Sequence, residues 1–322
     1  SPFWGPRIRH LVVNYVPFIM DMIENDKSEW KIFARYRAVA ERRAGKDAPN
    51  PCVHNWAEAT VLNTFESMCW ALTIDPQGDP GMSAAQQQIR AGVERWIPVI
   101  LGAQEPDGYL CTDVQMRGFP RFISPLVSSV RQGEEKLPEY AEDHHEGYMM
   151  GYLIECAIAH YRATGGKDLR MYRAAKKGAD LFVNTLGDPP KLAWQPDHPE
   201  LEQALERFSL LVDEVEGGGA GDSYRQFAKW LLDNRGITPP HNDAYRQKNK
   251  PLAQQNEPYG HAVMLGYLYS GAADVARFTG DPVLSAAADR MWERLVNGKM
   301  YLTGAMGSQH EEFRKSYDLP TD

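Results

Sequence analysis

Three histidines occupy similar places in the chain, each at the start of a segment with the apolar pattern of a helix. His145 stands just before a segment that begins at Gly147, His198 opens a second segment, and His261 lies in the first turn of a third. In a ring of helix pairs, side chains at such starts gather at one mouth, where ligands bind. Stability alone does not require the same polar residue at each start, so we predict that the three imidazoles bind a common ligand. They suit hydrogen bonds to several sugar hydroxyls; three imidazoles could also bind zinc, but no i, i+4 pair on one helix supports a metal site.

A second candidate group is a glycine-containing segment near the end of the sequence, Tyr301–Phe313, which carries the adjacent carboxylates Glu311 and Glu312. Two neighbouring carboxylates raise the pKa of one of them, and a carboxyl group with a raised pKa can act as a general acid. The alternative is a solvated acidic loop without a chemical role, and the residues alone favour that alternative.

The elements that must position these residues repeat along the chain as pairs of helices. Each pair has an apolar first helix, a turn that contains glycine, and an amphipathic second helix. The predicted pairs are 147–163 with 168–186, 198–215 with 222–234, and 257–278 with 281–296. Asp281 is expected to cap its helix, with Pro282 in the first turn. A helix that is apolar around most of its circumference is buried, so we expect the first helices to form an inner ring and the second helices an outer ring.

The N-terminal half follows this scheme less regularly. Residues 55–72 and 83–103 have helical patterns, Pro98 is expected to kink the second of them, and residues 120–138 have the composition of an irregular loop. Alternating strand patterns are almost absent. The sequence therefore predicts an all-α fold, a single domain over residues 1–322 in which helix pairs form a toroid.

Composition excludes several classes of function. The 322 residues carry a formal net charge of −8, with basic residues scattered along the chain, so nothing supplies the counterion release of nucleic-acid binding. No stretch is long and apolar enough for a membrane helix. The four cysteines (Cys52, Cys69, Cys111 and Cys156) have no metal-ligand spacing, and no disulfide framework is expected. The sequence does not decide between the cytoplasm and the periplasm of a bacterium as the compartment. It also leaves open whether the protein forms a homo-oligomer.

With these residues in view, the chain resembles the β-L-arabinofuranosidases of glycoside hydrolase family 127 over nearly its whole length. The resemblance rests on ordered blocks: Ser1–Trp4, Asp107–Leu110, His145-Glu146 with Gly151–Glu155, His198–Glu202, Gly260–Val263 with Gly266–Leu268, and Met300–Gly304 through Tyr317–Pro320. It implies an (α/α)6 barrel, followed in the family by β-sandwich domains that lie outside this sequence. It also implies a plant-derived oligosaccharide as the substrate.

The resemblance further implies a retaining hydrolysis that releases a terminal β-L-arabinofuranose-like sugar from plant cell-wall glycans. By this comparison His145, His198 and His261 contact the sugar, and Glu311 is the acid/base, with Glu312 as a second candidate because the loop is short. The family's nucleophile is a cysteine thiolate on zinc. Its zinc ligands come from cysteine motifs that would lie beyond Asp322, so we expect no metal ligand within residues 1–322 and no catalytic role for the four cysteines.

One departure bears on the substrate. Relatives carry Asp-Ser-Asp and Lys-Trp-Leu-Glu near the sugar pocket, where this chain has Trp56–Thr60 and Asn63–Glu66. A family variant releases aceric acid from the pectin rhamnogalacturonan II, and Arg117, Arg121 and Arg131 could bind its carboxylate. Two different functions also remain open: a non-catalytic sugar-binding relative, and an epimerase in which paired histidines move a proton.

Overall fold

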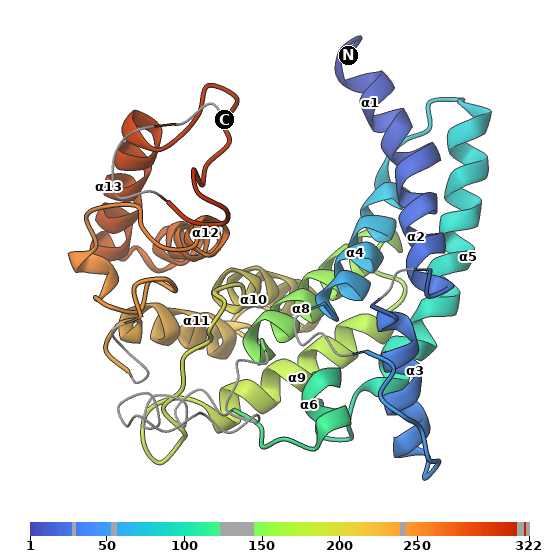
Figure 1. The fold of residues 1–322 in the computed structure, drawn as a ribbon, viewed down its shortest axis with the longest axis horizontal. Coiled ribbons are helices and arrows are strands. Elements are labelled where there is room, and N and C mark those ends of the chain that lie inside the picture. Colours follow the sequence, from blue (N-terminus) through green and yellow to red (C-terminus); the bar gives the residue numbers. More distant parts are fainter. Residues whose placement is uncertain (28–29, 53–56, 123–144, 239–242, 314–318, 320–322) are drawn as a thin grey trace. The chain divides into compact units, whose positions relative to one another are not determined.

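The computed structural model describes residues 1–27, 30–52, 57–122, 145–238, 243–313 and 319. Among these residues the regular structure is helical, and the β-structure consists of isolated bridges (Figure 1). The helices are α1 (Trp4–His10), the π-helical turn η1 (Leu11–Tyr15), α2 (Val16–Glu24), α3 (Ile32–Arg43), α4 (Ala59–Thr73), α5 (Pro80–Ala103), α6 (Thr112–Arg117), α8 (Glu146–Ala163), α9 (Arg170–Thr185), α10 (Leu201–Glu216), α11 (Asp222–Asn234), the 3-10 turn η3 (Leu252–Gln254), α12 (Ala262–Thr279) and α13 (Pro282–Gly298). The predicted all-α class is confirmed for the described residues.

The chain divides into two compact units, and each is described by itself. Unit 1 comprises Ser1–Phe119 and Tyr152–Leu181, and unit 2 comprises Pro120–Gly151 and Phe182–Asp322. The organisation of residues 1–322 as a single domain, with inner and outer rings, stays a prediction.

In unit 1, α5 packs against α3 and α4. The start of α5 follows from its sequence, because the carboxylate of Asp79 accepts hydrogen bonds from the backbone N–H groups of Gly81 (2.8 Å) and Met82 (3.1 Å). The helix then runs through Pro98 to Ala103. Aromatic packing fills the contact with α3, where the rings of Phe33 and Trp96 lie 4.7 Å apart.

In unit 2, α10 packs against α11 and α12, and α12 packs against α13. The predicted cap of α13 is confirmed: Asp281 accepts hydrogen bonds from the N–H groups of Val283 (2.8 Å) and Leu284 (3.1 Å). Buried side chains of α13 lie at three- and four-residue spacing, as an amphipathic helix requires: Leu284, Ala287, Met291 and Leu295.

Most predicted helices are confirmed, with shifts of a few residues at their ends. The prediction of a helix start at residue 257 was wrong, since α12 begins at Ala262. Pro258 and Gly260 disfavour helical backbone there, and Gly260 has a φ of +69°. The helices α1, α2, α3 and α6 were not predicted. The loop predicted at residues 120–138 lies mostly outside the described residues.

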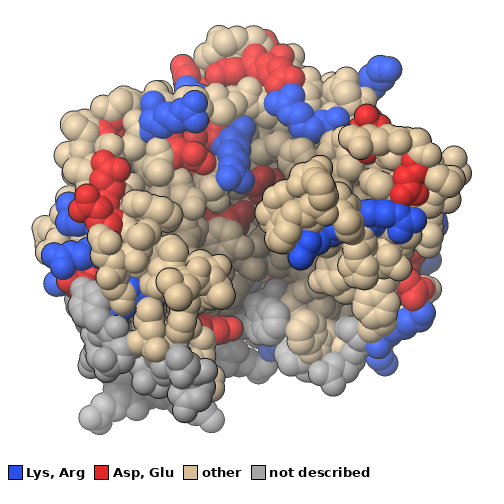
Figure 2. All heavy atoms as spheres, turned by 90° about the horizontal axis from the view of Figure 1, so that it is seen from above, with Lys and Arg blue, Asp and Glu red and all other residues tan. Residues whose placement is uncertain are grey.

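No helix in the described part of the chain is both long enough and apolar enough to cross a membrane. Figure 2 shows Lys and Arg side chains interspersed with Asp and Glu on the face that it presents, without a broad basic area. On this face, mixed charge does not favour a polyanionic partner.

Candidate active site

The three predicted histidines lie together in unit 2. The ring centroids of His145 and His198 are 5.9 Å apart, and those of His198 and His261 are also 5.9 Å apart. His198 is therefore the middle member of a row, which we call the histidine row. The three residues come from different helix starts, as the repeat predicted, because each shortly precedes α8, α10 or α12.

His145 has an unusual backbone and a carboxylate partner. Its φ of +57° lies in the left-handed region, which a residue with a side chain adopts only when its surroundings hold it there. Its Nδ1 atom lies 3.2 Å from the Oδ2 atom of Asp197, and both side chains are largely buried. The carboxylate of Asp197 therefore lies within ion-pair distance of the His145 ring.

His198 lies between aromatic rings. Tyr148 lies with its ring centroid 4.3 Å from that of His198, and Tyr267 lies at 5.5 Å. Burial lowers the pKa of His198 to about 3, although the nearby Asp197 opposes this shift. The imidazole is therefore neutral near neutral pH. Its buried Nδ1 atom has no hydrogen-bond partner within the described residues, and such an atom is available to a ligand hydroxyl.

The backbone around His198 is held by buried cations. Arg235 donates hydrogen bonds to the carbonyl oxygens of Pro196 (3.4 Å) and Arg246 (2.7 Å), and it pairs with Glu202 at 3.4 Å. Lys248 donates to the carbonyl oxygen of Gln195 at 3.4 Å. These contacts fix the segment that carries Asp197 and His198.

His261 is the N-cap of α12, and this role determines its protonation. Its Nδ1 atom accepts a hydrogen bond from the N–H group of Met264 (3.3 Å), so the proton of the neutral ring lies on Nε2. That Nε2 atom is 3.1 Å from the Oε2 atom of Glu311. Burial lowers the pKa of His261, and the Glu311 carboxylate opposes the shift. The structure therefore brings the predicted acid/base Glu311 next to the histidine row.

The segment that carries Glu311 is fixed to the start of α12, as Figure 1 shows for the chain that follows α13. The carbonyl oxygen of Glu311 accepts a hydrogen bond from the N–H group of Ala262 (2.7 Å), and Phe313 donates to the carbonyl oxygen of Gly260 (3.0 Å). Phe313 is buried, whereas the side chain of Glu311 is 70% exposed. Its neighbour Glu312 lines a separate cavity. The predicted residues Tyr317, Asp318 and Pro320 lie outside the described part of the chain.

A third segment of the chain, around Tyr245, completes the support of His261. The carbonyl oxygen of Tyr245 accepts a hydrogen bond from the N–H group of His261 (2.8 Å), and the two rings lie 5.4 Å apart. The buried amide of Gln247 donates to the carbonyl oxygens of Tyr259 (2.8 Å) and His261 (3.1 Å). Gly260 permits this close approach, because a Cβ atom there would lie 2.4 Å from the oxygen of Tyr245.

Sequence reasoning missed several residues of this site: Tyr148, Asp197, Tyr245, Gln247 and Tyr267. Asp197 precedes His198 in the chain but contacts His145, which belongs to another helix pair. Only the three-dimensional arrangement of the pairs shows such a contact. Tyr148 follows His145 by three residues, so helical spacing from that histidine was an available signal. Tyr267, six residues after His261, carried no such signal.

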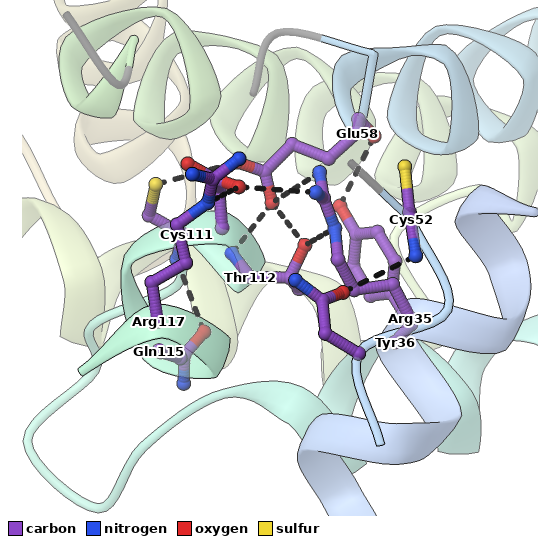
Figure 3. Close-up of polar contacts among 10 residues, drawn as sticks. Arg35, Tyr36, Cys52, Glu58, Cys111, Thr112, Gln115 and Arg117 are labelled. Atoms are coloured by element: carbon purple, nitrogen blue, oxygen red, sulfur yellow. Dashed lines mark hydrogen bonds and ion pairs between the residues drawn. The ribbon is translucent and has the colours of Figure 1, made fainter. Parts of the chain in front are cut away.

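Glu58, from the stretch in which this chain departs from its relatives, belongs to a different cluster within unit 1. Figure 3 shows Arg35 beside Glu58 and Thr112, and all three side chains are fully buried. Glu58 accepts hydrogen bonds from the N–H and hydroxyl groups of Thr112 and from the thiol of Cys111 (3.3 Å). Arg35 donates to Thr112 (3.0 Å) and to Asp113 (3.2 Å). Burial raises the pKa of Glu58. The cluster connects α3, α6 and the residue before α4.

The described residues do not fit a zinc site. No group of three or more His, Cys, Asp or Glu side chains among them is arranged to hold a metal ion. The four cysteines are buried, and burial raises the pKa values of Cys69 and Cys156. Buried thiols of this kind stay protonated and are poor nucleophiles.

Comparison with known proteins agrees with these features. Residues 80–322 match the family described as "Beta-L-arabinofuranosidase, GH127 catalytic domain". The non-reducing end β-L-arabinofuranosidase of Bifidobacterium longum subsp. longum is 29% identical over 100% of this chain and 50% of its own length.

Two solved structures are similar. One is a GH127 β-arabinofuranosidase (28% identity, TM-score 0.76), of which the match covers 99% of this chain and 45% of that chain. The other is a GH127 β-L-arabinofuranosidase from Geobacillus stearothermophilus T6 (25% identity, TM-score 0.78, 99% and 48%). The chain thus spans about half the length of these relatives.

The fold and these comparisons together define a helical domain of a glycosidase family. The chain belongs to glycoside hydrolase family 127, and it matches that family's catalytic region. The predicted fold class and the predicted family are both confirmed.

Proposed function

We propose that the chain supplies the sugar-binding residues and the acid/base of a retaining glycoside hydrolase. The substrate we propose is a plant cell-wall glycan that ends in a β-L-arabinofuranose-like sugar. The observation that supports this best is the histidine row, whose last member, His261, lies 3.1 Å from the carboxylate of Glu311. Imidazoles next to a carboxyl group match the needs of a sugar subsite, where hydroxyls are bound and one glycosidic oxygen is protonated.

In this proposal Glu311 acts twice. It first donates its proton to the glycosidic oxygen as the bond to the anomeric carbon breaks, and it then removes a proton from the incoming water. His261 holds the carboxylate in place: its Nε2–H group points to Glu311 because Nδ1 is occupied by the cap of α12. Glu312 is the less favourable candidate, since it lines another cavity.

The nucleophile is expected on the zinc-binding cysteine motifs that the resemblance places beyond Asp322. Zinc, when bound there, would hold a cysteine as its thiolate. The described residues offer no substitute for this nucleophile, so the roles proposed here for them are limited to binding, orientation and proton transfer.

A neutral sugar fits the surroundings better than the carboxylated aceric acid. The carboxylates of Asp197 and Glu311 border the histidine row, and burial keeps His198 uncharged. A ligand carboxylate would meet like charges here. Arg117 pairs with Asp113 at 3.0 Å within unit 1, and Arg131 lies outside the described residues.

The test uses the full-length gene product, with zinc content and sugar release measured together. We expect stoichiometric zinc, release of L-arabinose but not of aceric acid, and loss of turnover by a factor of about 10³ in Glu311→Gln. Glu312→Gln is the matched control, and its activity should stay within a few-fold of the parent. A zinc-free protein that releases neither sugar would refute a hydrolase and favour a sugar-binding relative.

A further inference from the structure

Two members of the histidine row depend on backbone segments that are distant in the sequence. Residues 195–198 precede α10 and include His198, whereas residues 245–247 support His261. In this second segment the carbonyl oxygen of Tyr245 accepts a hydrogen bond from the N–H group of His261 (2.8 Å). The amide of Gln247 donates to the carbonyl oxygen of His261 (3.1 Å). The distance between the two imidazoles therefore depends on how these two segments lie against each other.

A single buried guanidinium connects the two segments. Arg235, the C-cap residue of α11, is fully buried. Its Nη1 atom donates a hydrogen bond to the carbonyl oxygen of Pro196 (3.4 Å), two residues before His198. Its Nη2 atom donates to the carbonyl oxygen of Arg246 (2.7 Å), the middle residue of the second segment. One side chain thus bonds to the backbone on both sides.

A second buried cation makes a parallel contact. Lys248, which directly follows the second segment, donates from Nζ to the carbonyl oxygen of Gln195 (3.4 Å) in the first segment. Arg235 also pairs with Glu202 of α10 at 3.4 Å. Because two buried charges lose their hydration, such a pair adds little to stability by itself. A well-attested use of buried polar groups is instead to fix one relative placement of the elements that they join.

The shape of the guanidinium suits this use. It presents several N–H donors in a planar fork with fixed directions, whereas a lysine ammonium is a point charge on a flexible stem. We propose that Arg235 is a positioning residue, which sets the distance of 5.9 Å between the rings of His198 and His261 so that both bind the same sugar. Arg235 acts through the backbone of the two segments, and Lys248 supports the same placement through one contact. This inference rests on the proposed function, in which the histidine row binds the sugar.

The same helix offers a matched control. Arg225 lies on α11 and pairs with Glu206 of α10 at 2.9 Å, and this carboxylate is also buried. The guanidinium of Arg225 donates further hydrogen bonds to the side chains of Ser209 (2.9 Å) and Asp222 (3.3 Å). Both arginines therefore join α11 to α10 through a buried carboxylate, but these contacts of Arg225 lie outside the two segments beside the histidine row.

The experiment measures sugar binding with the full-length gene product. Isothermal titration calorimetry would use methyl β-L-arabinofuranoside and protein with Glu311→Gln, so that the sugar is not consumed. We expect Arg235→Lys to weaken binding by about tenfold, the equivalent of one lost hydrogen bond in the row, and Arg225→Lys to stay within about twofold. The Kd is a property of the folded molecules. A residue that only stabilised the fold would change the folded fraction and leave the Kd unchanged.

Turnover gives a second readout. With Glu311 intact and p-nitrophenyl β-L-arabinofuranoside as substrate, we expect Arg235→Lys to lower kcat/KM by about 10²-fold, because a small displacement of a binding group has this effect on rate. Lys248→Gln removes one contact and should weaken sugar binding by about threefold. This variant also tests the inference if Arg235→Lys does not fold, and an unchanged affinity in it would then overturn the positioning role.

Two other results would overturn the inference. If Arg235→Lys binds the sugar as the parent does, the fork of Arg235 does not set the row. If Arg225→Lys loses as much affinity as Arg235→Lys, the losses come from the joint between α10 and α11 and not from the two segments. In both cases the parent still binds and hydrolyses the sugar, so the proposed function stands. A parent protein that binds no sugar refutes the proposed function, and the positioning role with it.

Discussion

The histidine row should make the stability of the protein depend on pH through one residue, His198. Burial lowers the pKa of this imidazole from its ordinary 6.5 to about 3, and 7% of the residue is exposed. Between these two pH values the unfolded chain binds a proton at this position, whereas the folded chain does not. The free energy of unfolding therefore falls as the pH drops from 6.5 toward 3, and the contribution of His198 is fully present above pH 6.5.

The size of the effect follows from the gap of about 3.5 pH units. One unit corresponds to about 1.4 kcal/mol, so the full contribution is on the order of 5 kcal/mol. An experiment at about pH 4.5 samples about two units of the gap, which corresponds to about 3 kcal/mol. Replacement by asparagine, which does not titrate, should remove this part of the acid sensitivity.

The assay is urea denaturation followed by tryptophan fluorescence at about pH 7.5 and about pH 4.5. The parent should lose about 3 kcal/mol more than His198→Asn between the two pH values, because all other titrating groups are common to both proteins. His10→Asn is the matched control, since His10 is exposed on α1, and it should behave as the parent does. If the parent and His198→Asn lose the same stability, the folded protein accepts a proton on His198, and the argument for a neutral His198 is wrong.

Three further predictions concern the support of the two clusters and of α13. Arg35→Met should lower the free energy of unfolding by about 3–5 kcal/mol, because it leaves the carboxylate of Glu58 buried without its cation and leaves Asp113 with Arg117 alone; Arg37→Met, which breaks an exposed pair with Asp26, should cost less than about 1 kcal/mol. Gly260→Ala should destabilise the protein by at least about 2 kcal/mol more than Gly304→Ala, since both glycines have positive φ but only at Gly260 would a Cβ atom meet backbone oxygens. Asp281→Ala should cost about 1 kcal/mol, and Asp281→Asn, which keeps the capping oxygen, should cost much less. Urea denaturation at about pH 7.5 measures all three, and equal values within any pair would contradict the reason given for it.

The helix pairs were predictable because local signals determine them. Asp281 and Asp79 cap their helices through their own side chains, and Gly280 ends α12 in the left-handed conformation. These interactions span only a few residues, so a single sequence contains the whole signal. The start of α12 was misplaced because its cap is His261, which is not among the usual capping residues.

The helices before residue 44 were missed for a physical reason as well. On α1, η1 and α2, large apolar residues such as Trp4, Leu11 and Phe18 are exposed, so apolar character does not mark a buried face there. On α3 the reverse holds, since Arg35 is fully buried in the cluster with Glu58. A pattern of hydrophobicity cannot identify a helix whose buried face includes an ion pair.

The candidate site was predictable in its histidines and its carboxylate, but not in its internal contacts. Each of His145, His198 and His261 opens a helix, and the repeat alone placed them together. The carboxylates next to them come from elsewhere in the chain: Asp197 lies 3.2 Å from His145, and Glu311 reaches His261 from fifty residues away. These partners matter for the chemistry, because two carboxylates beside the imidazoles disfavour an anionic ligand. The order of residues in the chain predicts the row, whereas the preference for a neutral sugar that we propose depends on contacts that form only when the helix pairs pack against one another.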